Sequence, residues 1–133
     1  MSQMEISDQT TITRDPRRIQ VLFAGHHVAD STGALVVREA GQSPVWYFPR
    51  ADVDMLVLAR NGKQADTASK GPATYYTLYR EGHVVEDGVW SFESPPPAFE
   101  ALAGRIVFQP IHFEFEADGH QPTDWDRERD GPR

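Results

Sequence analysis

The chain has 133 residues, of which 39% are hydrophobic and 25% are charged, and its formal net charge at pH 7 is −7. A chain of this length has room for one domain with its own core and none for a second. It contains no cysteine, which excludes disulfides, thiolate nucleophiles and cysteine-based zinc sites. The negative charge disfavours nucleic acid as a partner, because phosphate contacts require clustered lysine and arginine.

Residues 1–15 are polar and lack the apolar core of a secretion signal. No stretch approaches the roughly 18 apolar residues that a membrane-spanning helix needs. Together with the absence of cysteine, these features predict a cytoplasmic protein that does not enter the membrane.

The beginning of the chain predicts a flexible arm over residues 1–17, because polar residues dominate and apolar periodicity is absent, although a strand can form near Ile12. Apolar and β-branched residues then predict strands at 19–24 and 34–39. We interpret these two strands as a hairpin whose connection is the polar stretch 26–33.

Turn residues at 40–44 are followed by the aromatic segment 45–48, which predicts a short buried strand that Pro49 ends. The apolar segment 55–58 is too short for its period to separate helix from strand, and we favour a strand. The polar stretch 61–72 predicts a long loop, a kind of segment that is often functional in compact domains.

The second half of the chain predicts a meander of further strands at 73–79, 84–85 and 89–92. Three prolines follow Ser94, and this serine can cap a short helix near residues 95–103. The apolar side of that helix would consist of Phe99 and Leu102, with Gly104 as its end.

The C-terminal part predicts a strand at 105–108 and another over 111–116, where strict alternation places the apolar side chains on one face: Ile111, Phe113 and Phe115. A polar tail of mixed charge is expected over residues 118–133. The whole pattern predicts a mainly β fold of antiparallel strands with one short helix, as a single domain over residues 18–117 between the arm and the tail.

Six short motifs follow one another along the chain: Ala29-Asp30-Ser31, Glu39, Tyr47-Phe48-Pro49-Arg50-Ala51-Asp52-Val53, Lys70-Gly71-Pro72-Ala73-Thr74-Tyr75-Tyr76, Val89-Trp90-Ser91-Phe92 and Gly104-Arg105-Ile106-Val107-Phe108. Their order resembles a bacterial and fungal family called domain of unknown function 427, over roughly residues 19–116. The resemblance implies a small β-rich domain of β-tent (Mss-like) topology, similar to zinc-binding β-tent proteins but without their cysteines. Some members are labelled nucleotidyltransferase-like, a label that implies no established mechanism.

The sequence departs from this family in one loop. The usual family pattern there is Cys-Pro-x-Lys-Gly, and this chain has Thr67-Ala68-Ser69-Lys70-Gly71. A thiol-based role of the loop is therefore excluded. The hydroxyl of Thr67 replaces a thiolate only in part, because a hydroxyl is far harder to ionise.

The same loop is the first candidate for a binding site. Thr67 and Ser69 supply hydroxyls, Lys70 supplies an ammonium group, and Gly71 permits close approach of the backbone. This combination can hold a phosphate or a carboxylate, although its glycine spacing differs from that of a Walker loop. The alternative is an ordinary surface loop with a solvated lysine.

A second group of candidates lies in the neighbouring motifs. Arg50 can point into a pocket shared with Lys70, or it can pair with Asp52 and fix the turn, and we favour the structural role. Tyr76 and Trp90 are large enough to cover an apolar part of a ligand, although Trp90 is favoured as a core residue. Adjacent strand residues point to opposite faces, so only one of the two neighbouring tyrosines can face a given site.

Metal and catalytic patterns are weak or absent in the sequence. His112, Glu114 and Glu116 share one predicted strand face, but side chains along a flat strand are spaced by about 7 Å, too far for one metal ion. No nucleophile triad, paired carboxylate motif or dinucleotide-binding glycine pattern occurs. We therefore predict no metal and no cofactor, and the sequence assigns no catalytic residue.

Two hypotheses of function follow. The first is a domain that binds a small anionic ligand, nucleotide-like or carboxylate, in a pocket near the Lys-Gly loop lined by Lys70, Arg50, Asp52, Thr67, Ser69, Tyr76 and Trp90. The second is a non-enzymatic interaction module that binds a protein partner or a second copy of itself through a sheet face or edge.

Overall fold

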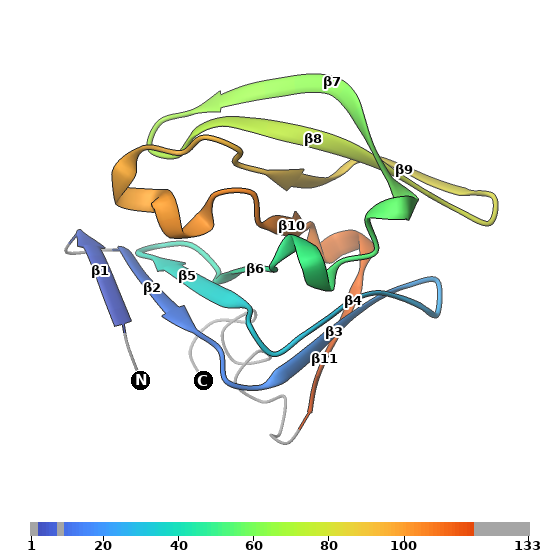
Figure 1. Cartoon of the computed structure of the whole chain (residues 1–133), viewed down its shortest axis with the longest axis horizontal. Helices are drawn as coiled ribbons and strands as arrows, with labels where there is room; N and C mark the ends of the chain where they lie inside the picture. Colours follow the sequence, from blue (N-terminus) through green and yellow to red (C-terminus); the bar gives the residue numbers. More distant parts are fainter. Residues whose placement is uncertain (1–2, 8–9, 119–133) are drawn as a thin grey trace.

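The structure of the chain, a computed structural model, describes residues 3–7 and 10–118, with side chains described for residues 10–117 (Figure 1). Every described strand pair is antiparallel. The other regular elements of this part of the chain are short 3-10 helices. The predicted mainly β fold of antiparallel strands is therefore confirmed, while the β-tent topology stays an implication of the family resemblance.

The described strands form three sheets. The first has the order β1 (Gln3–Ser7), β2 (Thr10–Arg14), β5 (Leu35–Glu39) and β6 (Val45–Tyr47). The second has the order β10 (Ile106–Phe108), β9 (His83–Ser91), β8 (Gly71–Arg80) and β7 (Leu58–Thr67). The third has the order β11 (Glu114–Asp118), β3 (Arg18–Phe23) and β4 (His26–Ser31).

Among the described residues, one isolated bridge joins the first two sheets. Phe48, which directly follows β6, exchanges two backbone hydrogen bonds of 2.9 Å with Ile106 at the start of β10. Both side chains are fully buried. Figure 1 shows the result: β6 and β10 lie side by side in the middle of the molecule, with β7, β8 and β9 on one side and β3, β4 and β11 on the other.

The core consists of two clusters of buried side chains on opposite faces of the joined sheets. The larger cluster draws on all three sheets and includes Ile19, Val36, Phe48, Leu78 and Phe108. The smaller cluster contains Ile12, Val37, Tyr47, Phe92, Phe99, Leu102 and Val107, among others. Adjacent residues of β5 belong to different clusters, so this strand is covered on both faces, as its continuous apolar sequence requires.

The helix predicted near residues 95–103 is present as the 3-10 helix η3 (Pro97–Leu102). Its two apolar residues, Phe99 and Leu102, are buried as expected, and Gly104 has a φ of +72°. Ser94 does not cap it, because Pro96 occupies the N-cap position and no side chain caps the helix. The backbone of Phe99 is not helical, which interrupts the element after its first turn.

The predicted hairpin of residues 19–24 and 34–39 is wrong. The polar stretch 26–33 contains β4, and β3 pairs with β4, not with β5. The turn between β3 and β4 lies at Ala24-Gly25, both of which have positive φ angles. His27 and Asp30 of β4 are exposed, and a bulge in the β3–β4 pairing breaks the alternation, so the polar strand resembled a loop in the sequence.

Residues 10–17 differ from the predicted arm. They contain β2, whose central residue Ile12 is 3% exposed and lies opposite Val37 of β5. Asp15 and Arg17, which follow this strand, are also buried. Residues 1–2, 8–9 and 119–133, and with them nearly all of the predicted tail, lie outside the described residues.

The long loop predicted over residues 61–72 is wrong. Most of it belongs to β7, an edge strand of the second sheet that pairs with β8 on one side. A bulge between Arg60 and Gln64 interrupts the pairing, and nearly all residues of β7 are exposed. An edge strand that buries neither face has no apolar alternation, so its sequence cannot be distinguished from a polar loop.

Two further strand predictions are wrong where a 3-10 helix replaces a strand. Residues 55–57 form η2 (Met55–Val57), whose N-cap residue Asp54 accepts a hydrogen bond from the backbone of Leu56. Residues 110–112 form η4 (Pro110–His112), because a proline at the first helical position favours a helical start. Ile111 is consequently 80% exposed instead of facing the core with Phe113.

None of the helices in the described part of the chain has the length and apolar character needed to cross a membrane. The described residues also contain no group of three or more His, Asp or Glu side chains close enough to hold a metal ion.

A buried ion pair fixes the corner between β2 and β3. Two guanidinium nitrogens of Arg17 bind the two carboxylate oxygens of Asp15 at 2.9 and 2.7 Å, and the indole of Trp46 donates to the same carboxylate at 3.1 Å. The two charged side chains are 7% and 6% exposed. Burial raises the pKa of Asp15, but the hydrogen bonds from Arg17 and Trp46 outweigh burial and lower it.

We expect the substitution Asp15→Ala to lower the free energy of unfolding by about 3–5 kcal/mol, because it leaves the guanidinium of Arg17 buried without its carboxylate. Urea denaturation followed by tryptophan fluorescence measures this change. Asp30→Ala is the matched control, since Asp30 also binds an arginine through both oxygens but is 43% exposed. It should cost about 1 kcal/mol or less, and equal losses for the two variants would contradict the burial argument.

Candidate functional site

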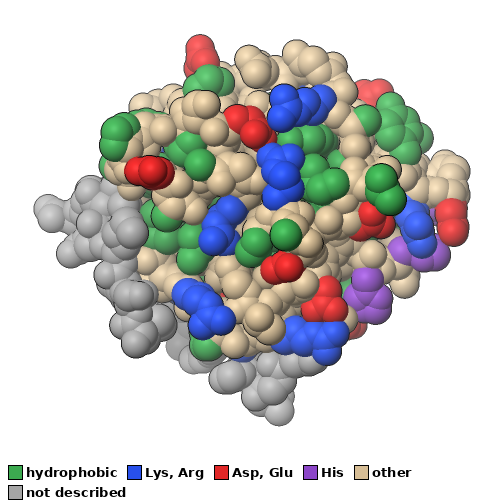
Figure 2. Space-filling model, viewed as in Figure 1, with side chains coloured by type: hydrophobic (Ala, Val, Ile, Leu, Met, Phe, Trp, Pro, Cys, Tyr) green, Lys and Arg blue, Asp and Glu red, His purple; other side chains and the backbone are tan. Residues whose placement is uncertain are grey.

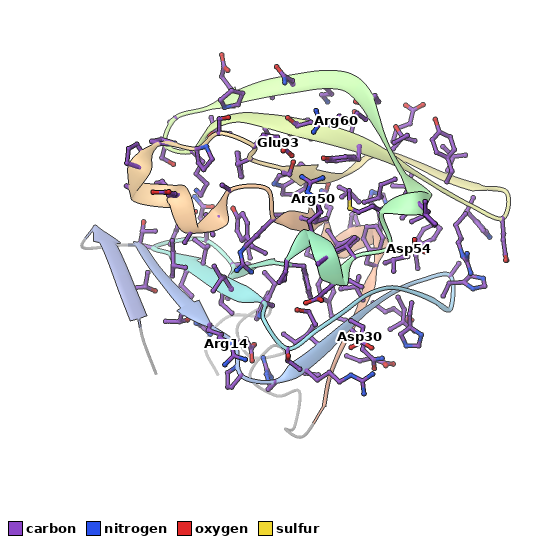
Figure 3. All side chains as sticks on the ribbon, viewed as in Figure 1. Arg14, Asp30, Arg50, Asp54, Arg60 and Glu93 are labelled. Atoms are coloured by element: carbon purple, nitrogen blue, oxygen red, sulfur yellow. The ribbon has the colours of Figure 1, made fainter. Side chains whose placement is uncertain are left out.

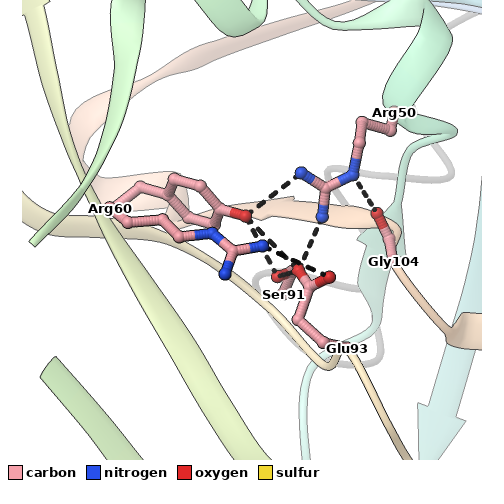
Figure 4. A network of polar contacts seen from close by, with 6 residues as sticks. Arg50, Arg60, Ser91, Glu93 and Gly104 are labelled. Atoms are coloured by element: carbon pink, nitrogen blue, oxygen red, sulfur yellow. Dashed lines mark hydrogen bonds and ion pairs between the residues drawn. The ribbon is translucent and has the colours of Figure 1, made fainter. Parts of the chain in front are cut away.

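Arg50 lies at the centre of a polar network that joins several strands. It begins η1 (Arg50–Asp52), two residues after the bridge at Phe48. Its Nε donates to the carbonyl oxygen of Gly104 at 3.0 Å. Gly104 precedes Ile106 by two residues, so the bridge between β6 and β10 places the arginine and this carbonyl side by side (Figure 4).

The rest of the network comes from β8, β9 and the residues after β9. Arg50 donates to the hydroxyl of Tyr76 at 3.1 Å and to Oε2 of Glu93 at 2.6 Å. The same carboxylate oxygen accepts hydrogen bonds from Ser91 and, at 3.3 Å, from Tyr76. Three donors therefore converge on one oxygen atom of Glu93, as Figure 4 shows.

Arg60 reaches the same carboxylate from the edge strand β7. Its Nη2 lies 3.7 Å from Oε1 of Glu93, and its side chain is 62% exposed. Arg60 lies opposite Tyr76 in the strand pairing, so both side chains leave the sheet on the same face. Figure 3 shows Arg50, Arg60 and Glu93 together on one face of the molecule.

The electrostatics of the network keep Glu93 ionised. Burial raises its pKa, but hydrogen bonds from Ser91 and Arg50 and the positive charges of Arg50 and Arg60 outweigh burial and lower it. Burial also lowers the pKa of Arg50, and its contacts with Tyr76 and Glu93 reverse the direction and raise it. The site thus contains two guanidinium groups and one carboxylate, with a net positive charge.

One of the two roles expected for Arg50 was a pair with Asp52, and the structure does not show this pair. The carboxylate of Asp52 accepts a hydrogen bond of 2.7 Å from Ser31, whose hydroxyl also accepts one from the backbone of Gly33. Arg105 donates to the carbonyl of Gly33 at 2.9 Å. Burial lowers the pKa of Arg105, and the charge of Asp52 opposes this effect.

The Lys-Gly loop forms a separate group of contacts. Lys70 lies between the two carboxylate oxygens of Glu39, at 3.2 and 3.3 Å, and its ammonium group is 5.0 Å from the centre of the Phe99 ring. The lysine side chain is only 11% exposed. No described hydrogen bond or ion pair joins it to Arg50, so the two cations that were expected to share an anion have different partners.

The hydroxyls of this loop serve its own backbone. Thr67 donates to the carbonyl of Gly71 at 2.8 Å and accepts from the backbone of Lys70 at 3.1 Å. Ser69 is exposed at the tip of the turn. Gly71 has a φ of +81°, a left-handed backbone conformation that residues with a side chain rarely adopt, which explains the glycine.

The aromatic candidates lie on opposite faces of the second sheet. Tyr76 is opposite Val89 and is 2% exposed, with only its hydroxyl in the network of Arg50. Trp90 is opposite Tyr75, with ring centres 6.2 Å apart on the other face. The expected separation of the two tyrosines is confirmed, and Trp90 cannot cover a ligand that contacts Tyr76.

The sequence missed four residues that the structure places in or beside the network: Arg60, Ser91, Glu93 and Arg105. Ser91 and Arg105 lie within motifs that carried the family resemblance, which was a usable signal. Glu93 lies two residues after the end of the strand β9, and Arg60 directly precedes the stretch that was predicted as a loop. Nothing in their spacing indicated that they meet.

These observations define a class of protein: a small, mainly β domain with a half-buried cluster of arginine, tyrosine and glutamate between its sheets. The chain belongs to the family named domain of unknown function 427, whose model matches residues 11–119. This match confirms the resemblance that the motifs indicated. No curated protein is similar enough to the chain to match it.

The depressed pKa of Glu93 has a consequence for stability. Its charged form stabilises the folded state at pH values above its unfolded pKa, about 4.3, and this contribution is lost as the pH falls through the lower folded pKa. We expect Glu93→Gln to lower the free energy of unfolding by about 1 kcal/mol at pH 7 and by less at pH 3.

Urea denaturation of both proteins at the two pH values measures this difference. The control is Glu86→Gln on β9, since Glu86 is exposed and forms no described ion pair. A Glu93→Gln deficit that is equal at pH 3 and pH 7 would show that the charge of Glu93 does not stabilise the fold.

Proposed function

We propose that this domain binds a small ligand with one anionic group, a carboxylate or a phosphate, at the site formed by Arg50, Arg60, Tyr76 and Glu93. One observation carries the proposal: two guanidinium groups share a single carboxylate, so the cluster has a net charge of +1. Guanidinium groups match the planar geometry of carboxylates and the oxygens of phosphates better than ammonium groups do.

Both arginines have donors left for a ligand. Each nitrogen of Arg50 donates one described hydrogen bond, and its two terminal nitrogens each retain a second N–H group. Its side chain is 35% exposed, so solvent reaches part of it. Arg60 is held by one long contact of 3.7 Å, and it can turn to an incoming anion at little cost.

The proposal concerns binding and not catalysis. Ser91 is fully buried and hydrogen-bonded, which leaves its hydroxyl without access to a substrate. The lowered pKa of Glu93 makes it a poor proton donor at neutral pH, since a general acid needs a pKa near the working pH. No cofactor enters the proposal.

The site differs from the pocket first expected near the Lys-Gly loop. Lys70 is compensated by Glu39, so its charge offers less to a ligand than the arginine pair does. The ring of Tyr76 is buried, and Trp90 lies on the other face of the sheet, which leaves neither ring to stack on a nucleotide base beside Arg50. The geometry therefore supports a simple carboxylate or phosphate better than a nucleotide.

A thermal-shift experiment tests the proposal with glutarate, citrate, glucose 6-phosphate and AMP, each at 10 mM. Binding to the folded state alone raises Tm, and a ligand at about ten times its Kd should raise it by roughly 5 °C. We expect at least one anion to stabilise the wild type and Arg60→Ala to abolish the shift.

Lys63→Ala is the matched control. Lys63 lies on the same strand β7, is 53% exposed and contributes the same charge, but it pairs with Asp87. The shift should survive this change. If all four anions leave Tm of the wild type unchanged, or if Lys63→Ala removes the shift as fully as Arg60→Ala, the proposed site is wrong.

A second candidate function, an interaction module, is favoured by one observation. Tyr79 and Val84 lie opposite each other on β8 and β9, and both are more than half exposed. An exposed pair of large apolar side chains at the end of a hairpin is a common feature of protein interfaces. If two copies associate there, Val84→Lys should convert a dimer to a monomer in light scattering after size-exclusion chromatography, and a monomeric wild type would exclude this candidate.

A further inference from the structure

A row of four arginines crosses the face of the molecule that contains the proposed site. The row begins with Arg14, which donates to the carbonyl of Thr32 at 2.6 Å. The carbonyl of Gly33, the residue after Thr32, accepts a hydrogen bond from Arg105. The carbonyl of Gly104, the residue before Arg105, accepts a hydrogen bond from Arg50. Arg50 and Arg60 then form ion pairs with the same carboxylate, that of Glu93.

The figures show the same order in space. Figure 3 places Arg60, Arg50 and Arg14 one after another across this face. In Figure 2, Lys and Arg side chains follow one another across the middle of the same face, with hydrophobic side chains between them. The row therefore runs from the outer strand of the second sheet to the end of β2.

The charge of this row is much less compensated than the charge of the other described cations. Five of those six cations have a carboxylate within ion-pair distance, in the pairs Arg17–Asp15, Arg18–Asp30, Lys63–Asp87, Lys70–Glu39 and Arg80–Glu81. The sixth, Arg38, donates to the hydroxyl of Thr13. Arg14 and Arg105 instead bind main-chain carbonyls and form no ion pair among the described residues. A carbonyl fixes a guanidinium group without cancelling its charge.

We propose that this arginine row binds an acidic peptide in extended conformation, whose carboxylates lie over Arg60 and Arg50 at one end and over Arg105 and Arg14 at the other. The proposal rests on the anion site described above and extends it with a second pair of arginines. In a protein of net charge −7, positive charge left uncompensated on one face attracts an acidic partner to that face.

Two carboxylates within the row favour a peptide over a polyphosphate or a nucleic acid. Glu93 lies between Arg50 and Arg60, and Asp52 lies close enough to Arg105 to influence its pKa. A phosphate backbone carries negative charge at every unit and has no donor for these carboxylates. A peptide spaces its acidic side chains by about 7 Å on one side of an extended chain, and its backbone N–H groups can donate to the carboxylates between them.

Fluorescence anisotropy with a labelled peptide of about ten residues, alternating glutamate and serine, tests the proposal on the full chain. Arg14→Ala should weaken binding by about tenfold, the value of one charged hydrogen-bonded contact. Arg18→Ala removes an equally charged exposed arginine that Asp30 already neutralises, and it should change the affinity by less than about twofold. A peptide with glutamine in place of glutamate should not bind.

The outcomes separate this proposal from the one on which it rests. If a small anion still stabilises the protein through Arg60 while Arg14→Ala leaves the peptide affinity unchanged, the extended partner is wrong and the anion site stands. If inorganic polyphosphate binds more tightly than the peptide and also depends on Arg14, the peptide is the wrong class of ligand. If neither the peptide nor any small anion binds, both proposals fail.

Discussion

The backbone bridge between Phe48 and Ile106 is the constraint on which the rest of this structure depends. Two hydrogen bonds join β6 to β10 and so connect two four-stranded sheets that would otherwise be separate. Both residues are fully buried, where an unpaired backbone group is costly, so the bridge is also a requirement of the core. The crossing also places Arg50 beside the carbonyl of Gly104, because each lies two residues from it, while β7, β8 and the residues after β9 supply Arg60, Tyr76 and Glu93.

Ion pairs in this protein serve two different purposes, and burial distinguishes them. Asp15 and Arg17 are buried together, with an indole as third partner, and they fix a corner of the backbone. Around Glu93, two arginines compete for one half-buried carboxylate, and the network remains partly open to solvent. The first arrangement is complete and has a structural role, whereas the second has charge and donors left over, which is the physical basis for proposing a ligand there.

The sequence predicted those elements whose side chains alternate between core and solvent or are buried on both faces. The buried strand at 45–48, the strand at 73–79 and the apolar pair Phe99 and Leu102 of the short helix were all correctly predicted. It failed on β4, where a bulge breaks the alternation, and on β7, which is exposed along nearly its whole length, because polar strands without alternation resemble loops. It also failed at Ile111, because alternation was assumed to continue across a proline that instead starts a 3-10 helix.

By itself the sequence determined the class of fold, the absence of thiol chemistry and the family, since composition, strand periodicity and motif order are local properties of the chain. It also named Arg50 and Tyr76, two of the residues that meet at the site. Only the tertiary structure decided that Arg50 meets Glu93 and Arg60, while Lys70 is bound by Glu39. These residues are separated along the chain by the strands that bring them together, and which strands become neighbours depends on backbone pairing across the sheets, which no local pattern encodes.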